Sequence, residues 1–190
     1  MSIRTYSCVF AIVAVLAVAC SRDAQPLSPS VGGSVFAVAG GLERIVKLFD
    51  ACDPATFNAI LGPGACTRNG GVTFQNFIDE LTRTRSAGAW HFAPTVLTMK
   101  EGQALVALNT GGETHTFTEV DEFGGGIVPN LNQLAGLTTV AHECTELKPG
   151  DFLPPGARSS EVEEETGVEK YQCCIHPWMR AEVRITEKEK

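Results

Sequence analysis

One short stretch near the C-terminal end, residues 171–179, constrains this chain more than any other feature of its sequence. It reads Tyr-Gln-Cys-Cys-Ile-His-Pro-Trp-Met, and the short spacings between Cys173, His176 and Met179 can turn all three side chains onto one metal ion. A thiolate and two imidazoles with a weak axial thioether form the ligand set of a copper electron-transfer site. The stretch therefore predicts three of the four ligands of a mononuclear copper site.

The fourth ligand, a second histidine, must come from elsewhere, and His115 is the favoured source. It stands in Gly-Gly-Glu-Thr-His-Thr-Phe-Thr, where the glycine pair ends one strand and the alternating threonines suit the next. His91, between two aromatic residues on an expected strand, is favoured as half-buried with a local hydrogen-bond partner. His142, in an expected loop, is favoured as a surface residue.

The loop Cys-x-x-His-Pro-x-Met resembles that of the cupredoxins, the type 1 blue copper proteins, in its plastocyanin- and amicyanin-like form. In that family the upstream histidine lies just past a strand-to-strand turn, as His115 does, and a tyrosine often precedes the cysteine by two residues, as Tyr171 does. The resemblance covers roughly residues 88–187, about half of the chain. It implies a Greek-key β-sandwich, one Cu(I)/Cu(II) ion, and one-electron transfer with transient redox partner proteins.

A second cysteine, Cys174, directly follows the expected ligand and departs from the family pattern. As the ligand it would leave only one residue before His176, so Cys173 is favoured. A dinuclear purple copper centre would need two cysteines three residues apart, which this loop lacks. Structural zinc prefers four strong ligands, and methionine is not among them.

Pro177 and Trp178 flank His176, and one interpretation is that they simply pack over the site. The sharper one, partly from the family resemblance, is an apolar patch around an exposed edge of the His176 ring. An electron could leave there towards a docked partner through a small, transient interface.

The N-terminal residues predict export. Residues 1–19 carry Arg4 before a short apolar run and are typical of a signal peptide, and the run ends Leu-Ala-Val-Ala-Cys, which resembles a bacterial lipoprotein cleavage site. Cys20 would then carry a lipid, and residues 20–34, rich in Ser, Pro and Gly, would form a flexible tether. Ordinary cleavage near Ala19 is the alternative. Either way we expect the periplasm or cell envelope, with membrane contact only through the lipid.

Export makes disulfides favourable because the compartment is oxidising. Setting aside Cys8, Cys20 and Cys173 leaves four cysteines, which allow three pairings: Cys52, Cys66, Cys144 and Cys174. Pairing Cys52 with Cys66 is favoured because the two flank one expected short helix, and Cys144 with Cys174 would follow. The second bridge would hold the residue beside the metal ligand.

Apolar spacing predicts a small helical segment over residues 35–86, before a β-rich domain over 88–187. The first of its three helices would carry an apolar face at residues 42, 45, 46 and 49. The second would begin at Asp53-Pro54, and the third would begin after a Thr73 cap. After it, residues 104–108 and 181–186 are typical of strands, and residues 122–136 of a long irregular insertion. The expected fold is mainly β, a Greek-key sandwich behind a helical preface.

Charge and composition exclude several functions. The net charge is -7, and removal of residues 1–19 leaves 14 basic against 22 acidic residues, or -8, so nucleic acid is not an expected partner. Four histidines are too few for a multicopper oxidase, and no Ser-His-Asp arrangement or phosphate loop is present, so we do not expect an enzyme. The competing hypotheses are a periplasmic copper-binding or copper-carrier lipoprotein without a redox circuit, and a scaffold with a vestigial site.

Overall fold

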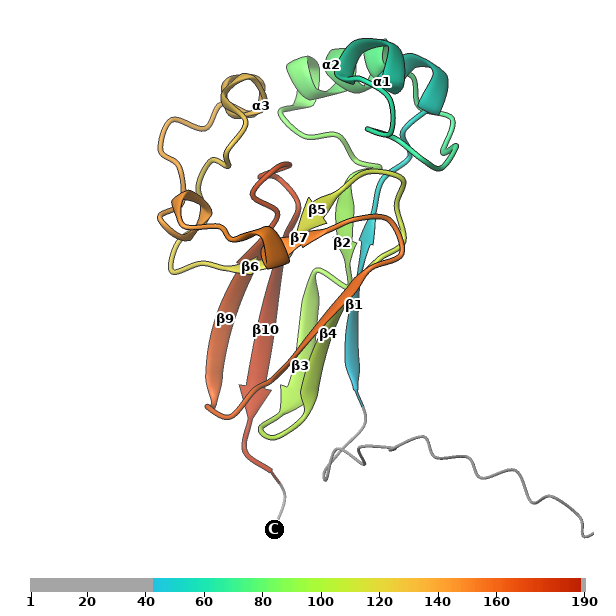
Figure 1. Cartoon of the computed structure of the whole chain (residues 1–190). Coiled ribbons are helices and arrows are strands. Elements are labelled where there is room, and N and C mark those ends of the chain that lie inside the picture. The colour runs from blue at the N-terminus through green and yellow to red at the C-terminus, as the bar shows by residue number, and fades with distance from the viewer. Residues whose placement is uncertain (1–42, 189–190) are drawn as a thin grey trace, which may run out of the picture. The chain divides into compact units, whose positions relative to one another are not determined.

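The computed structural model describes residues 43–188 as two four-stranded β-sheets with helices at one end (Figure 1). The first sheet has the order β2-β1-β4-β8, formed by His91–Ala93, Arg44–Phe49, Ala104–Asn109 and Arg158–Val162. The second has the order β3-β10-β9-β6, formed by Val96–Lys100, Arg180–Thr186, Gly167–Gln172 and Thr118–Glu119. A two-stranded ladder pairs β5 (His115–Thr116) with β7 (Phe152–Leu153). The prediction of a mainly β fold is confirmed, whereas the Greek-key connection stays a prediction.

Apolar side chains from both sheets fill one shared core. In β10 the buried residues Ala181, Val183 and Ile185 alternate with more exposed ones, as expected for a strand with one face inward. In β4 nearly every residue is buried, as predicted from its continuous apolar run. Fully burying one such aliphatic side chain stabilises the fold by roughly 1.5 to 3 kcal/mol.

The prediction of a helix around residues 42–49 is wrong, because residues 44–49 form strand β1. Its apolar residues fit both periods, but Val46 and Leu48 are buried while Lys47 between them is exposed. The β-branched Ile45 and Val46 also favour a strand. Pairing with the distant β4, in parallel, decides between the two periods. Residues 43–86 therefore contribute a strand to the sandwich and are not a separate helical unit.

The other two helices of this segment are confirmed. Helix α1 (Pro54–Leu61) begins after Asp53, whose carboxylate accepts a hydrogen bond from the Thr56 amide at 3.1 Å, and ends at Gly62. Helix α2 (Phe74–Thr84) begins after Thr73, whose hydroxyl accepts from the Asn76 amide at 3.2 Å. Within residues 43–188, no helix has the length and apolar character needed to cross a membrane.

The insertion expected to be irregular contains a third helix, α3 (Pro129–Ala135). Proline at its first turn and Gly136 at its end, with a φ of 70°, are ordinary helix boundaries, so this signal was present in the sequence. The expected signal peptide (residues 1–19), tether (20–34) and Cys20 lie outside the described residues, as do residues 35–42.

A group of three carboxylates surrounds the hydroxyl of Tyr171 where the chain passes from one sheet to the other, between β8 and β9. The hydroxyl lies 3.1 Å from Glu161, 3.3 Å from Glu163 and 2.8 Å from Glu169. It can donate only one hydrogen bond. Burial and the charges of the other two carboxylates raise the pKa of Glu163 to about 7.

Replacing Glu163 with glutamine is expected to flatten the pH dependence of stability. Because the folded-state pKa of Glu163 is raised from 4.5 to about 7, its protonation stabilises the fold fully below pH 4.5, and this contribution is lost as the pH rises through 7. We expect about 1 to 2 kcal/mol after allowing for solvent screening. Urea unfolding between pH 4 and 8 checks this, with Glu164→Gln at an exposed position as control; parallel curves for wild type and Glu163→Gln would contradict it.

Candidate metal centre

The turn between β9 and β10 carries three of the expected ligands and lies at the helix-bearing end of the sandwich (Figure 1). The Cys173 amide donates to the Met179 carbonyl at 3.0 Å, and the Met179 amide donates to the His176 carbonyl at 2.9 Å. These bonds fold residues 173–179 into a tight loop. The sequence prediction that this spacing turns the three residues inward therefore has a direct backbone basis.

Two imidazoles converge on one thiol inside this end of the protein. The Nδ1 atoms of His115 and His176 each lie 3.8 Å from the Cys173 sulfur, and the three ligand atoms all lie within 4.8 Å of one another. Metal bonds of about 2.0 Å to nitrogen and about 2.3 Å to sulfur, at trigonal angles, would separate the two atoms by about 3.7 Å. The three side chains are 0 to 4% exposed, so the donor set fits a buried metal ion.

The environment of Cys173 favours the thiolate. Backbone amides of Thr116 and His176 each point at its sulfur from 3.4 Å. Complete burial would raise the pKa of this thiol, but its contacts with His115 and His176 lower the pKa well below the usual value. Because the thiolate is the form that binds metal, the chain prepares this residue for coordination.

Met179, the expected axial ligand, is only 1% exposed and lies in the same buried cluster as Cys173. Pro177 is buried and Trp178 half-buried, and His176 is only 4% exposed, so little of its ring is open to solvent. Phe77 from α2 lies 6.5 Å from the His176 ring and Trp178 lies 5.6 Å from it, between ring centroids, so Trp178 packs beside His176, and the electron-transfer patch stays a prediction.

A buried carboxylate, Asp50, supports His115 from behind. Its Oδ2 lies 2.9 Å from His115 Nε2, and it also accepts hydrogen bonds from the amides of Gly112 and Glu113. Burial opposes ionisation of Asp50, but these hydrogen bonds lower its pKa to about 2. Burial would also lower the pKa of His115, but its contacts with Asp50 and Cys173 outweigh burial and raise that pKa to about 9. A carboxylate on the far nitrogen fixes the ring's orientation and leaves Nδ1 for the metal.

A second carboxylate, Glu113, stands behind His176. Its Oε2 lies 3.8 Å from His176 Nε2 and accepts a hydrogen bond from the Trp90 indole at 2.6 Å. Burial raises the pKa of Glu113 despite the nearby imidazole and indole. Asp50, Cys52 and Glu113 also bring ligand-type atoms together, but the Cys52 sulfur is held in a disulfide.

Sequence reasoning missed both carboxylates, although the glycine pair before Glu113 was a signal. A Cβ at Gly111 would clash with the Asp50 carboxylate, and one at Gly112 would lie 2.8 Å from the Cys52 sulfur. Because glycine has no side chain, the loop before His115 can pack directly against the end of β1. A glycine pair beside a candidate ligand thus indicated close approach by another segment.

The structure contains both favoured disulfides, Cys52 with Cys66 and Cys144 with Cys174. Among the described cysteines only Cys173 is free, and it is buried. The Cys174 amide also donates to the Thr116 hydroxyl at 2.8 Å, so the residue beside the thiol is held by both its backbone and its side chain.

The other two histidines lie away from this cluster. His91 stacks on Phe49 with centroids 5.1 Å apart and places Nδ1 3.1 Å from the Gly88 carbonyl. It has the expected local partner but is exposed rather than half-buried. His142 is exposed, as expected, with a side-chain exposure of 77%.

Solved structures similar to this chain include several cupredoxins. The purple cupredoxin from Nitrosopumilus maritimus is 25% identical, with 53% of this chain and 86% of that chain covered and a TM-score of 0.38. A Cu(I) mutant of amicyanin is 18% identical, with 50% and 73% covered and a TM-score of 0.35. Plastocyanin from Dryopteris crassirhizoma is 16% identical, with 51% and 89% covered and a TM-score of 0.34.

A copper-containing nitrite reductase from Thermus scotoductus is also similar, at 21% identity over 52% of this chain and 21% of that one, with a TM-score of 0.34. No family model and no curated protein matches the sequence. With TM-scores this low, the function proposed below depends on this chain's own residues and their geometry.

Proposed function

We propose that this chain is an exported mononuclear type 1 copper protein that carries single electrons. The observation that carries the proposal is the convergence of two imidazole Nδ1 atoms, each at 3.8 Å, on one buried thiol. Soft thiolate and imidazole donors, with a buried thioether nearby, favour copper over zinc or a hard cation. The bound copper ion would supply the one-electron Cu(I)/Cu(II) couple.

Each residue has a distinct role in this proposal. Cys173, held as the thiolate, is the strongest donor and gives the main electronic path, while His115 and His176 complete the plane. Met179 supplies the weak axial thioether. The carboxylate of Asp50 holds the His115 ring, and the Cys144–Cys174 disulfide restrains the loop. A donor set fixed in this way changes little in geometry when the metal charge changes.

A copper carrier without a redox circuit is the competing function, and burial of the site favours the electron carrier. The three donors are at most 4% exposed, which opposes ready release of the ion. Repeated chemical oxidation and reduction in the presence of a strong Cu(I) chelator separates the two. An electron carrier is expected to keep its copper through many cycles, whereas loss of copper within the first reduction would support carriage.

Replacing Met179 with leucine is expected to keep the colour and raise the reduction potential. Leucine fills the buried position but donates no electron pair to the metal. The more highly charged Cu(II) should lose more affinity than Cu(I) when the thioether is removed. A tenfold change in the relative affinities corresponds to about 59 mV for one electron, and we expect at least this shift by voltammetry. Loss of all copper from this variant would count against the axial assignment.

The location follows from the expected N-terminal signal and the transient redox partners from electron transfer, and both belong to the same proposal. Cleavage at Cys20 with lipid attachment would hold the protein at the periplasmic face of a membrane, beside transient redox partner proteins. Mass spectrometry of the protein expressed in a bacterium would show a lipid-modified Cys20 at the N-terminus, and a Cys20→Ser variant would be released from the membrane fraction.

A further inference from the structure

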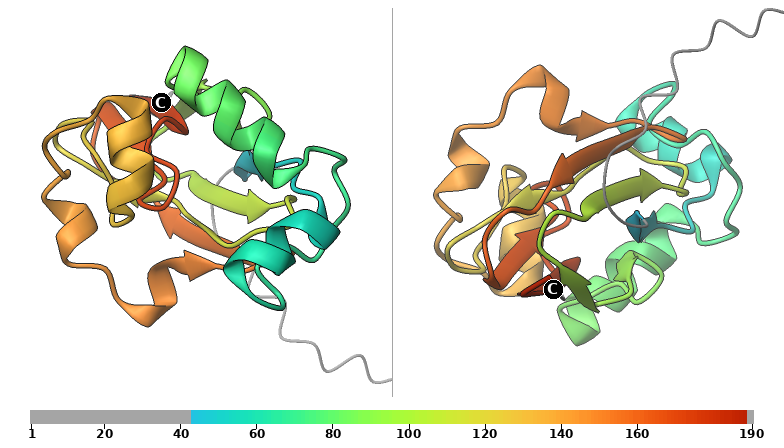
Figure 2. Two further views of the ribbon diagram at one scale, coloured as in Figure 1. Left: turned by 90° about the horizontal axis from the view of Figure 1, so that it is seen from above. Right: turned by 90° about the horizontal axis from the view of Figure 1, so that it is seen from below.

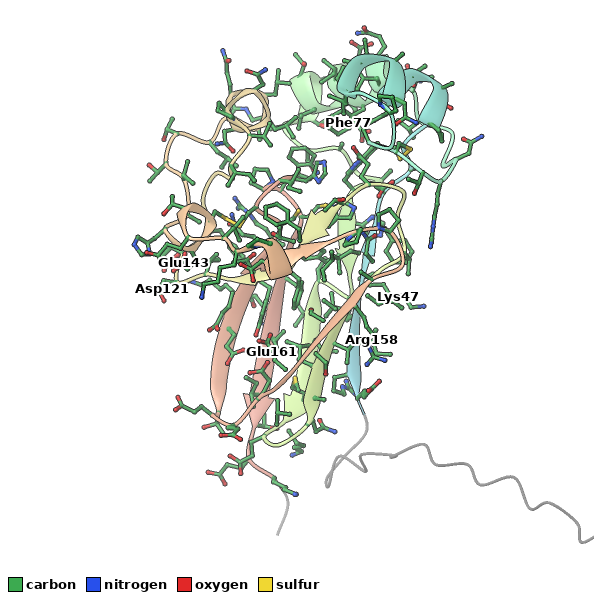
Figure 3. All side chains as sticks on the ribbon, viewed as in Figure 1. Lys47, Phe77, Asp121, Glu143, Arg158 and Glu161 are labelled. Carbon is green, nitrogen blue, oxygen red and sulfur yellow. A yellow bond between two sulfur atoms is a disulfide. The ribbon has the colours of Figure 1, made fainter. Side chains whose placement is uncertain are left out.

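A pocket of about 270 Å³ lies among α1, α2 and α3, with His176 and Glu113 in its lining. These two residues are buried, whereas Leu61 and Asn130, also in the lining, are exposed. The pocket therefore runs from the surface inward to a candidate metal ligand. The three helices surround this end of the sandwich (Figure 2), and Phe77 lies beneath α2 on its sandwich side (Figure 3).

The walls of the pocket are apolar and rich in aromatic rings. Phe57, Phe74 and Phe77 contribute three rings that already pack edge-on or tilted against one another at 5.2 to 6.2 Å. Leu134 from α3 closes the opposite side. Such walls favour a flat apolar molecule, which gains from edge-to-face contacts as well as from burial. The volume lies near the lower end of the range for small-ligand sites, so it suits one or two rings.

The inner end of the pocket offers a hydrogen-bond acceptor. Within residues 43–188, the Glu113 carboxylate accepts one hydrogen bond, from the Trp90 indole, while His176 Nε2 at 3.8 Å is too far for another. A carboxylate can accept about four, so Glu113 has acceptor capacity left for a ligand. No lysine or arginine lines the pocket, so an anionic ligand would find no counter-charge.

We propose that this pocket binds a small neutral aromatic molecule carrying a hydroxyl or amine, with the ring against the apolar walls and the donor group on Glu113. The inference goes beyond electron carriage, because binding uses residues that need no metal. It places a small molecule in contact with His176.

Calorimetric titration of the full chain with para-cresol tests the proposal, with the copper-loaded and the metal-free protein measured separately. We expect binding to both forms with Kd on the order of 1 mM, the scale for a ligand of this size. The metal-free arm makes the result independent of the copper proposal. The methyl ether of para-cresol, which lacks the donor, should bind about fivefold to tenfold more weakly, and this difference should shrink in Glu113→Gln.

A bulky side chain in the pocket should exclude the ligand. Leu134→Trp is expected to weaken para-cresol binding at least tenfold, and Ile78→Trp fills the same pocket from α2 if the first variant does not fold. Val168→Trp, on an exposed position of β9, is the matched control and should bind normally. The carbon-bound proton of the His176 ring should shift on titration in NMR spectra, and that of His142 should not.

The proposal is overturned if neither protein form binds para-cresol at millimolar concentration. It is equally overturned if Leu134→Trp and Ile78→Trp, both folded by circular dichroism, bind as tightly as wild type, because the ligand would then lie elsewhere. Equal affinity of the wild-type protein for para-cresol and its methyl ether would show that Glu113 does not accept a hydrogen bond from the ligand.

Discussion

Replacing Asp50 with asparagine is expected to weaken copper binding by about 10-fold to 100-fold and to raise the reduction potential. The carboxylate lies 2.9 Å from His115 Nε2 and is 1% exposed, so water cannot replace its charge. Asparagine keeps an oxygen for the amides of Gly112 and Glu113 but removes the negative charge. Because Cu(II) carries the larger charge, it should lose more affinity than Cu(I).

Competition with chelators for each oxidation state, together with voltammetry, measures both effects of Asp50→Asn. Asp121→Asn, on an exposed loop, is the control for a charge change without contact to the site. A merely structural role for Asp50 would lower stability and leave the difference between the two copper affinities unchanged. Unaltered affinities for both oxidation states would contradict the role assigned to Asp50.

Replacing Phe77 with alanine is expected to destabilise the protein by about 3 to 5 kcal/mol. Its ring is 3% exposed and contacts Phe57, Trp90 and Trp178, with centroids 5.7, 4.5 and 6.0 Å away. The change would leave a cavity between α2 and the end of the sandwich. It would also remove a ring that covers His176, so solvent should reach the site.

Urea unfolding measures the stability of Phe77→Ala, and the rate of copper loss to a chelator measures access to the site. Ile60→Ala, at a 64% exposed position on α1, should change the free energy of unfolding little. Phe77→Leu should recover much of the stability. A loss below 1 kcal/mol for Phe77→Ala would show that α2 does not depend on this contact.

The part of the site that sequence could supply is the part whose geometry is local. Cys173, His176 and Met179 belong to one loop, and hydrogen bonds within that loop turn them inward. His115 came from a turn pattern and from the position of other histidines among expected loops and strands. Its meeting with Cys173 depends on β5 and β9, which lie far apart in sequence.

What sequence could not supply depends on pairing between distant segments. Residues 44–49 fit a helical period as well as a strand, and only pairing with β4 settles the choice. Asp50 directly follows β1. Because residues 44–49 were expected to be helical, the contact between Asp50 and His115 could not be predicted. Likewise, His176 is only 4% exposed and lies beside Phe77 of α2, a contact that no local pattern in the loop indicates.

The helices at this end of the sandwich determine how the candidate metal site can be reached. They place Phe77 beside His176 and line an apolar pocket that reaches His176 and Glu113. Electron exchange with a protein would then pass through packed aromatic rings. Access by a small molecule would be direct.

Whether copper binds to the Cys173 thiolate is measured by the visible absorption spectrum of the protein without residues 1–20, loaded with Cu(II) and recorded beside a Cys173→Ser variant. We expect an intense band towards the red end of the spectrum, which bleaches on reduction and is absent from the variant, because it arises from the copper-thiolate bond. A colourless wild-type protein that nevertheless binds copper would contradict the electron-transfer proposal.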